Sequence, residues 1–216
     1  HKRFHDMYVL DENPDYEPLP SQSIKAIAIE QNKSPLELCL DILTRGDGKE
    51  MIYYAFLNYG ESSLNPAKEM MEHPNTILGL GDGGAHCGSI CDGSFTTHML
   101  THWTRGRSRG EKLELPWVVK AHCQDTAAAV GLNDRGILAP GYKADINIID
   151  LGKMRLKKPE VHYDLPAGGR RLMQFADGYI ATLVSGVPIY LNGESTGARP
   201  GRLVRGSQPK PNLRNY

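Results

Sequence analysis

The sequence has no charge imbalance and no long apolar segment. Lys+Arg and Asp+Glu both total 25, so the chain lacks the net positive field that drives binding to nucleic acid or to anionic membranes. Its longest apolar runs, at 77–80 and 127–130, are much too short to cross a bilayer. We therefore expect no nucleic-acid partner and no membrane partner, and a small-molecule substrate is the better prediction.

Cysteine is also scarce. The four cysteines, Cys39, Cys87, Cys91 and Cys123, show neither the density of a disulfide framework nor the paired spacing of a zinc finger. We interpret them as small buried hydrophobic residues. So few cysteines favour a reducing compartment. The chain also does not open with a basic segment followed by an apolar one, as a secretory signal would. We therefore expect a cytoplasmic location.

Patterns typical of strands and helices alternate over the first two thirds of the chain. A strand is predicted at 7–10, a helix from Ser21, and a second helix from the cap Ser34-Pro35-Leu36-Glu37, with Leu36, Leu40 and Leu43 recurring at helical spacing up to Gly46. Further elements follow as a strand at 51–57, a helix at 66–72, a buried strand at 76–80 and helices at 96–104 and 116–130. This alternation predicts an α/β fold with a parallel sheet.

The pattern changes beyond Gly131, where frequent glycines separate short β-like runs at 144–149, 180–184 and 187–191. The sequence therefore predicts an α/β part at 1–135, a small β-rich domain at 136–204 and a loosely ordered tail at 205–216.

One carboxylate stands out as a candidate catalytic group. In Leu78-Gly79-Leu80-Gly81-Asp82-Gly83-Gly84-Ala85-His86, a hydrophobic strand ends on an aspartate flanked by glycines, which allow a sharp turn and the close approach of a ligand. In a parallel α/β barrel, a carboxylate in this position points into the active site. The alternative is an Asx-turn aspartate that only closes a loop.

Several histidines follow Asp82. His86 could bind a metal, orient the carboxylate or contact the substrate, or it could be a loop histidine bonded to the backbone. His98 and His102 would share one face of a helix, the spacing that two metal ligands need. Because the residues between them lack the glutamate of a metalloprotease helix, core or surface histidines are the better interpretation.

A short basic cluster, formed by Arg105, Arg107, Arg109 and Lys112, follows these histidines. One of its guanidinium groups could bind an acidic group of the substrate. We favour a solvated helix end, since cations stabilise helix carboxyl termini.

The motif at 81–86 resembles the D-aminoacylase branch of the metal-dependent amidohydrolases, also called N-acyl-D-amino-acid deacylases. Further matches follow in order, at 125–132, in Asp-Arg-Gly-Ile-Leu-Ala-Pro-Gly-Tyr-Lys-Ala-Asp at 134–145, and in Thr-Gly-Ala-Arg-Pro-Gly-Arg at 196–202. The resemblance covers most of the chain from about Thr76 onward.

This resemblance implies the carboxy-terminal part of a TIM-like (β/α) barrel, followed by a small β domain, in a hydrolase of amide or other carbon–nitrogen bonds. It implies one or two divalent ions, with zinc expected, faced by Asp82, which accepts the proton of the attacking water. Gly83, Gly84 and His86 are the expected substrate-binding residues.

Two departures from the family pattern shape the remaining expectations. The His-x-His pair and the other metal ligands should lie upstream of His1, so we expect a missing amino-terminal half of the barrel, or a homo-oligomer partner, to complete the site. Alone, the chain should be inactive. The arginine that receives the substrate carboxylate in this family is absent from 87–97.

Two alternative functions are a non-catalytic binding or scaffold fragment and a cyclic-amide hydrolase of another amidohydrolase branch.

Overall fold

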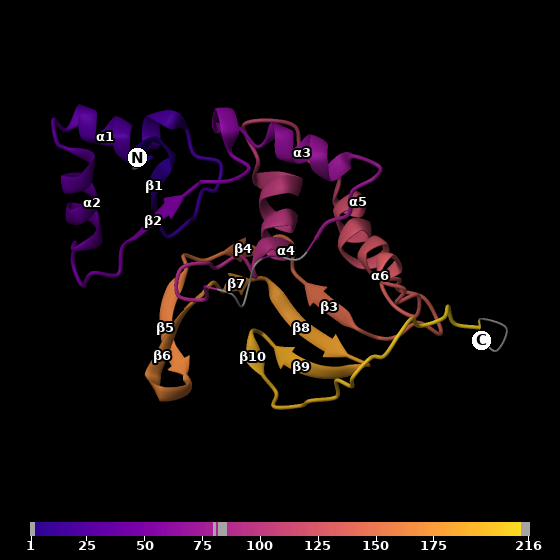
Figure 1. The fold of residues 1–216 in the computed structure, drawn as a ribbon. Helices are drawn as coiled ribbons and strands as arrows, with labels where there is room; N and C mark the ends of the chain where they lie inside the picture. Colours follow the sequence, from indigo (N-terminus) through magenta and orange to yellow (C-terminus); the bar gives the residue numbers. More distant parts are fainter. Residues whose placement is uncertain (1–2, 80, 82–85, 213–216) are drawn as a thin grey trace.

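The computed structural model describes residues 3–79, 81 and 86–212 (Figure 1). It contains an amino-terminal unit of two helices and one antiparallel strand pair, a group of helices beside it, and a β-rich part below them. Among the described helices, none combines the length and the apolar character needed to cross a membrane.

The amino-terminal unit follows the local signals of the sequence. After η1 (Phe4–Asp6), β1 (Met7–Leu10) pairs antiparallel with β2 (Met51–Tyr54). A turn of 3₁₀ helix, η2 (Pro20–Gln22), leads into α1 (Ile24–Glu30). The predicted helix cap at Ser34 is confirmed, because its hydroxyl accepts a hydrogen bond from Glu37 N at 3.2 Å at the start of α2 (Pro35–Leu43).

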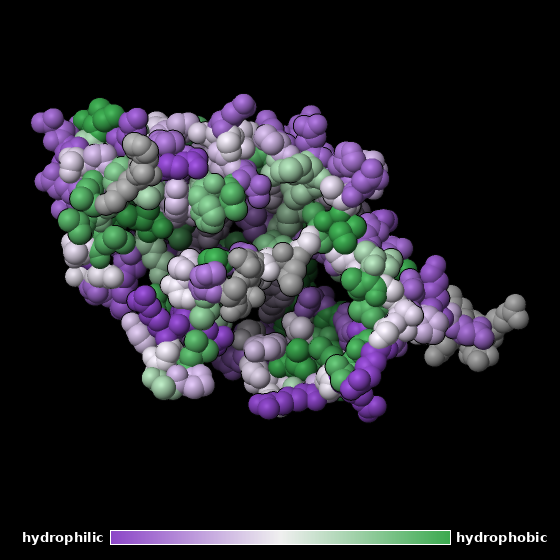
Figure 2. Space-filling model, in the orientation of Figure 1, coloured by the Kyte–Doolittle hydropathy of each residue, from purple (hydrophilic) through white to green (hydrophobic). Residues whose placement is uncertain are grey.

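Helix α2 buries a different face from the one that its leucine spacing predicts. Leu38, Cys39 and Ile42 are buried against Ile24 and Ala28 of α1. The predicted stripe is instead exposed, with 49% of Leu36, 56% of Leu40 and 43% of Leu43 accessible. Figure 2 shows hydrophobic residues at the surface of the amino-terminal unit. Both faces are apolar, so spacing alone could not decide which one would meet α1.

The predicted helices of the second group are confirmed, with irregular interiors. After η3 (Gly60–Ser62) come α3 (Asn65–Glu72) and then α4 (Phe95–His98), which continues as the π-helical η4 (Met99–Gly106). A second continuous run comprises α5 (Leu115–Lys120), η5 (Ala121–Asp125) and α6 (Thr126–Ala129). The runs pack together through a buried cluster of Met99, Trp103, Leu113 and Val118.

The predicted strand before Asp82 is not formed over residues 76–79, which are described as coil, and Ile77 is 58% exposed. All strand pairs among the described residues are antiparallel. A buried strand needs hydrogen-bonding partners on its edges, and the described part of the chain offers none to this segment. The predicted parallel sheet is thus absent from the described residues, and the TIM-like barrel stays a prediction.

The predicted β runs after Gly131 are confirmed as β3 (Ile146–Ile149), β8 (Tyr179–Val184) and β9 (Val187–Leu191). With β10 (Glu194–Ser195) they form a sheet of order β10-β9-β8-β3. Two further pairs were not predicted. These are β4 (Arg155–Leu156) with β7 (Ala176–Asp177), and β5 (Glu160–Leu165) with β6 (Gly169–Met173), the latter joined by η6 (Pro166–Gly168). The domain limits at 136 and 204 stay a prediction.

The tail is fastened to the rest of the chain at Gln208. Gln208 N donates to Gly131 O at 2.8 Å, and Asn133 N donates to Gln208 O at 3.0 Å, which forms a short parallel bridge. The other described tail residues form no helix or strand, and the loosely ordered tail stays a prediction.

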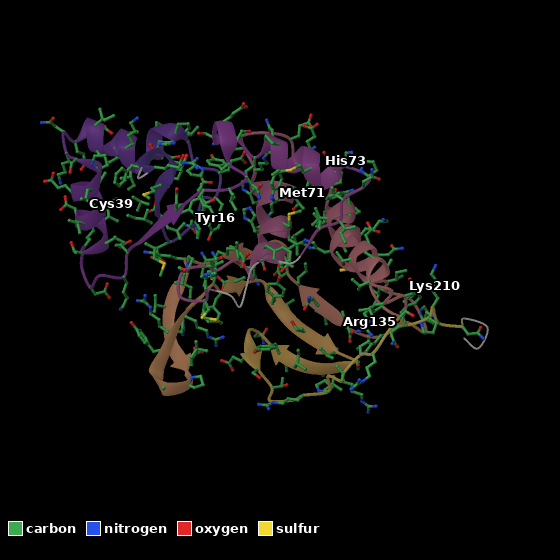
Figure 3. All side chains as sticks on the ribbon, in the orientation of Figure 1. Tyr16, Cys39, Met71, His73, Arg135 and Lys210 are labelled. Carbon is green, nitrogen blue, oxygen red and sulfur yellow. The ribbon has the colours of Figure 1, made fainter. Side chains whose placement is uncertain are left out.

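The three parts of the fold meet around α4. Tyr16, which Figure 3 shows between the amino-terminal unit and α4, accepts a hydrogen bond from Gln174 Nε2 at 2.7 Å. On the other side of α4, Thr97 Oγ1 and Tyr179 OH are hydrogen-bonded at 2.7 Å. The ring of Tyr16 also meets the ring of His98 edge to face, so α4 is held by a ring contact on one side and by a hydrogen bond on the other.

Candidate functional site

The predicted catalytic Asp82 and its neighbours Gly83 and Gly84 lie outside the described residues, but the chain on either side is placed. Gly81 packs closely on Asp92: a Cβ at Gly81 would lie 2.9 Å from Asp92 Oδ2 and 3.0 Å from its backbone oxygen. Only glycine fits such an approach without a shift. The half-buried carboxylate of Asp92 is thus next to the predicted site, and sequence reasoning missed it because the contact depends on how the 81–92 segment folds back.

His86, the described member of the predicted substrate-binding set, is exposed and begins a turn. Its backbone has φ +50°, a left-handed conformation that histidine adopts more often than most residues. Its carbonyl oxygen accepts hydrogen bonds from Ser89 N at 2.8 Å and Ile90 N at 3.0 Å. The turn is fixed to β6 because Leu172 N donates to Cys87 O at 2.6 Å. The imidazole is therefore accessible, and its substrate contact stays a prediction.

The described residues do not fit the zinc site that the resemblance implies. A zinc ion takes three or four protein ligands, and no group of three or more His, Cys, Asp or Glu side chains that could hold a metal occurs within 3–79, 81 and 86–212. The cysteines contribute none: Cys39 is buried as expected, Cys87 and Cys91 are half-buried, and Cys123 is exposed, against the expectation.

His98 and His102 are hydrogen-bonding and packing residues in this structure. Their rings stack with centroids 4.8 Å apart and planes 9° apart. The lone pairs of ring nitrogens lie in the ring planes, and two nearly parallel stacked planes do not meet at one ion. His98 also meets the ring of Tyr16 edge to face, and His102 Nε2 lies 3.1 Å from Glu17 Oε2. The interpretation as core histidines is supported.

Glu17 and Arg107 form a buried ion pair that sequence reasoning missed. The side chain of Arg107 is 0% exposed and that of Glu17 is 2% exposed. Arg107 Nε and Nη2 each donate to the Glu17 carboxylate at 2.9 Å, a bidentate arrangement. Leu64 N donates to the same carboxylate at 3.1 Å, and the guanidinium lies 4.7 Å from the ring centroid of Trp103. No local pattern marks Glu17, because its partner is 90 residues away.

The other arginines of the basic cluster also bind the protein itself. Arg109 donates to the carbonyl oxygens of Glu17, Pro18 and Ser62 and to the hydroxyl of Tyr59. Arg105 donates to the carbonyl oxygens of Leu151 and Met154 between β3 and β4. The preferred interpretation, a solvated helix end, is therefore wrong for Arg107 and Arg109, which bind groups inside the protein. It holds for Arg105, which is exposed in the last turn of η4.

Burial and pairing set the protonation of this network. Burial raises the pKa of Glu17, but hydrogen bonds from Arg107 and Leu64 outweigh it and the net pKa is lowered. Burial lowers the pKa of His102 in spite of the nearby Glu17 carboxylate. Burial, with the neighbouring His102, lowers the pKa of His98 to about 3. At neutral pH the network thus holds one carboxylate, one guanidinium and two neutral imidazoles.

The mixed α/β architecture is consistent with an amidohydrolase domain. The model of the Amidohydrolase family matches residues 17–190, and the chain belongs to this family. Membership supports a hydrolase that acts on carbon–nitrogen bonds. No curated protein and no solved structure matches the chain.

The buried pair gives a stability prediction. Arg107→Met should lower the free energy of unfolding by about 3–5 kcal/mol, because Glu17 is then left as an uncompensated buried charge. Urea unfolding followed by circular dichroism measures the change. The control is Arg155→Met, which removes an ion pair with Asp177 from a side chain 65% exposed and should cost at most about 1 kcal/mol. Equal losses of unfolding free energy in the two variants would show that the buried pair stabilises the fold no more than an exposed pair does.

The lowered pKa of His98 predicts sensitivity to acid. The unfolded chain protonates this histidine near pH 6.5, whereas the folded chain does so only near pH 3, so unfolding binds a proton between these values. Stability should fall as pH drops below 6.5, by up to about 1.4 kcal/mol per pH unit from His98. His98→Phe, which keeps an aromatic ring beside Tyr16, should flatten this dependence between pH 6.5 and 5 in urea titrations. An unchanged slope would show that His98 is not the responsible group.

Proposed function

We propose that this chain supplies the catalytic carboxylate of an amidohydrolase that cleaves N-acyl amino acids of the D series. The proposal rests on the family match at 17–190, which includes the Gly-Asp-Gly-Gly-Ala-His motif at 81–86. Asp82 accepts a proton from the attacking water and passes it to the leaving nitrogen. Gly83 and Gly84 allow the substrate to approach the backbone, and His86 contacts it.

The placement of the described flanks supports this role. Leu78 packs on the cluster that contains Met99 and Trp103, and Gly81 lies against Asp92. The segment that holds Asp82 therefore starts from a fixed point in the helical part and ends at the turn anchored to β6. The implied zinc would take its ligands from polypeptide outside the described residues, either an amino-terminal half of the barrel or a second subunit.

Arg170 is our candidate for binding the carboxylate of the substrate. The residues at 87–97 include no arginine, but Arg170 Nε of β6 lies 3.7 Å from the position that a Cβ on Gly88 would take. Its neighbour Arg171 is paired with Asp164 at 2.6 Å, whereas Arg170 has no partner among the described residues. An exposed and uncommitted guanidinium thus lies beside the turn that begins at His86.

The role of Asp82 is tested with the product of the complete gene, in a buffer containing zinc. It should hydrolyse N-acetyl-D-amino acids faster than hydantoin, a cyclic amide, and Asp82→Asn should lower kcat/KM at least about 100-fold because the general base is lost. Asp125→Asn is the control, since Asp125 pairs with Lys120 at the surface. Full activity in Asp82→Asn would refute the role, and a preference for hydantoin would move the protein to another branch.

The role of Arg170 is tested by comparing two substrates. Arg170→Met should raise KM for an N-acetyl-D-amino acid about 10- to 100-fold, the effect expected from losing a charge-assisted hydrogen bond. KM for the matching N-acetyl amine, which has no carboxylate, should stay the same. The control Arg171→Met should leave both values unchanged. Equal effects of Arg170→Met on the two substrates would show that Arg170 does not bind the carboxylate.

A further inference from the structure

Strand β6 and the residue after it hold the segment that follows the glycine-rich motif. Leu172 N of β6 donates to Cys87 O at 2.6 Å. Two residues further on, Gln174 Oε1 accepts a hydrogen bond from Ser94 Oγ at 2.5 Å, although the two residues are 80 positions apart in the sequence. The segment 87–94 is therefore fastened to the β-rich part near both of its ends.

The side-chain amide of Gln174 is fixed in one orientation by its partners. Its Nε2 atom donates to the hydroxyl of Tyr16, labelled in Figure 3, at 2.7 Å and to Lys157 O at 2.8 Å. A carbonyl oxygen only accepts hydrogen bonds, so the atom that faces Lys157 must be the amide nitrogen. The amide oxygen then faces Ser94, whose hydroxyl has to donate. Both donors and the acceptor of this amide are thus engaged.

Ser94 does not play the usual role of a serine in its position. It is the N-cap residue of α4, where a serine side chain ordinarily accepts a hydrogen bond from the second or third amide of the helix. The described part of α4 shows no such bond, and the hydroxyl is bound to Gln174 instead. The start of α4 is therefore held by a distant residue in place of a local cap.

The turn over residues 92–95 also contacts Gly81, the residue before the predicted catalytic Asp82. Phe95 N donates to Asp92 O at 3.1 Å, which closes this turn. A Cβ at Gly81 would lie 2.9 Å from Asp92 Oδ2 and 3.0 Å from Asp92 O, so the turn packs directly on the backbone of Gly81. A shift of the turn would therefore disturb the chain next to Asp82.

We propose that Gln174 is a positioning residue for the amide hydrolysis: it holds Ser94, and through the 92–95 turn it keeps Gly81 in the place that the action of Asp82 requires. This role of Gln174 rests on the proposed function of Asp82. A general base must lie within hydrogen-bonding distance of the proton that it accepts, and a displacement of about 1 Å can lower the rate about 100-fold. Because Gln174 acts through Ser94 and not on the substrate, its loss should lower kcat and leave KM unchanged.

Kinetics of the complete gene product with an N-acetyl-D-amino acid test this role. Gln174→Met keeps the length of the side chain but removes its hydrogen bonds, so kcat should fall about 10-fold while KM changes less than about twofold. Ser94→Ala should also lower kcat, and the double variant should be no slower than Gln174→Met alone, because both changes break the same contact. Gln31→Met is the matched control: it replaces an exposed glutamine after α1 and should leave kcat and KM unchanged.

Amide hydrogen exchange followed by mass spectrometry adds a measurement that needs no substrate. Gln174→Met should speed exchange in the peptide 92–98, where the amides of Phe95 and His98 are hydrogen-bonded in the turn and in α4, and not in the peptide 86–91. An inactive wild type would refute the hydrolysis and with it the catalytic role of Gln174. Wild-type kcat in Gln174→Met, additive losses in the double variant, or unchanged exchange at 92–98 would refute the role of Gln174 alone.

Thermal unfolding separates this role from a general effect on stability. Tyr16→Phe removes a hydroxyl bonded to Gln174 but keeps the bond between Gln174 and Ser94, so it should lower the melting temperature without lowering kcat. A loss of kcat in Tyr16→Phe as large as that in Gln174→Met would show a structural role only and would overturn the proposal. If Gln174→Met does not fold, Ser94→Ala, which removes a single hydrogen bond of this amide, replaces it in both measurements.

Discussion

The buried ion pair between Glu17 and Arg107 is the interaction on which the arrangement of the parts depends. Two charges removed from water are tolerated only when they are paired and their remaining hydrogen-bonding groups are satisfied, and here the backbone at Leu64, the amide of Asn65 and the carbonyl of Glu111 complete the set. Glu17 lies in the segment before α1, Leu64 and Asn65 lie at the start of α3, and Arg107 and Glu111 follow η4. Moving Glu17 or Arg107 would leave a buried charge unpaired, and moving one of the other three would remove a hydrogen bond from the pair.

This constraint extends to the candidate active site. With η4 fixed by Arg107, α4 is fixed as well, and its other contacts hold Tyr16 on one side and Tyr179 on the other. The cluster around Met99 in turn places Leu78. The glycine-rich segment with Asp82 therefore leaves from the helical part and returns at Cys87, on the β-rich part. The described residues on both sides of the Gly-Asp-Gly-Gly motif are therefore tied to packed parts of the fold.

Short-range signals predicted the structure well where the physical cause was itself local. The Ser34 cap, the strand at β1 and the helical spacing of 65–72 each act within a few residues, and each is present. Prediction failed where partners are distant. The apolar stripe of Leu36 and Leu40 is exposed because α1 packs on the other face, and residues 76–79 have no strand partner among the described residues.

The sequence by itself determined the family, the glycine-flanked acidic motif, and the change from helices to short strands after Gly131, because these depend on residue type and local spacing. Only the tertiary structure decided what the charged and polar residues do. Arg107 could be recognised as structural only once Glu17 lay beside it. His98 and His102 could be recognised as packing residues only once their rings were stacked. Charges and ring nitrogens interact with whatever lies within a few ångströms, and chain folding alone brings those neighbours together.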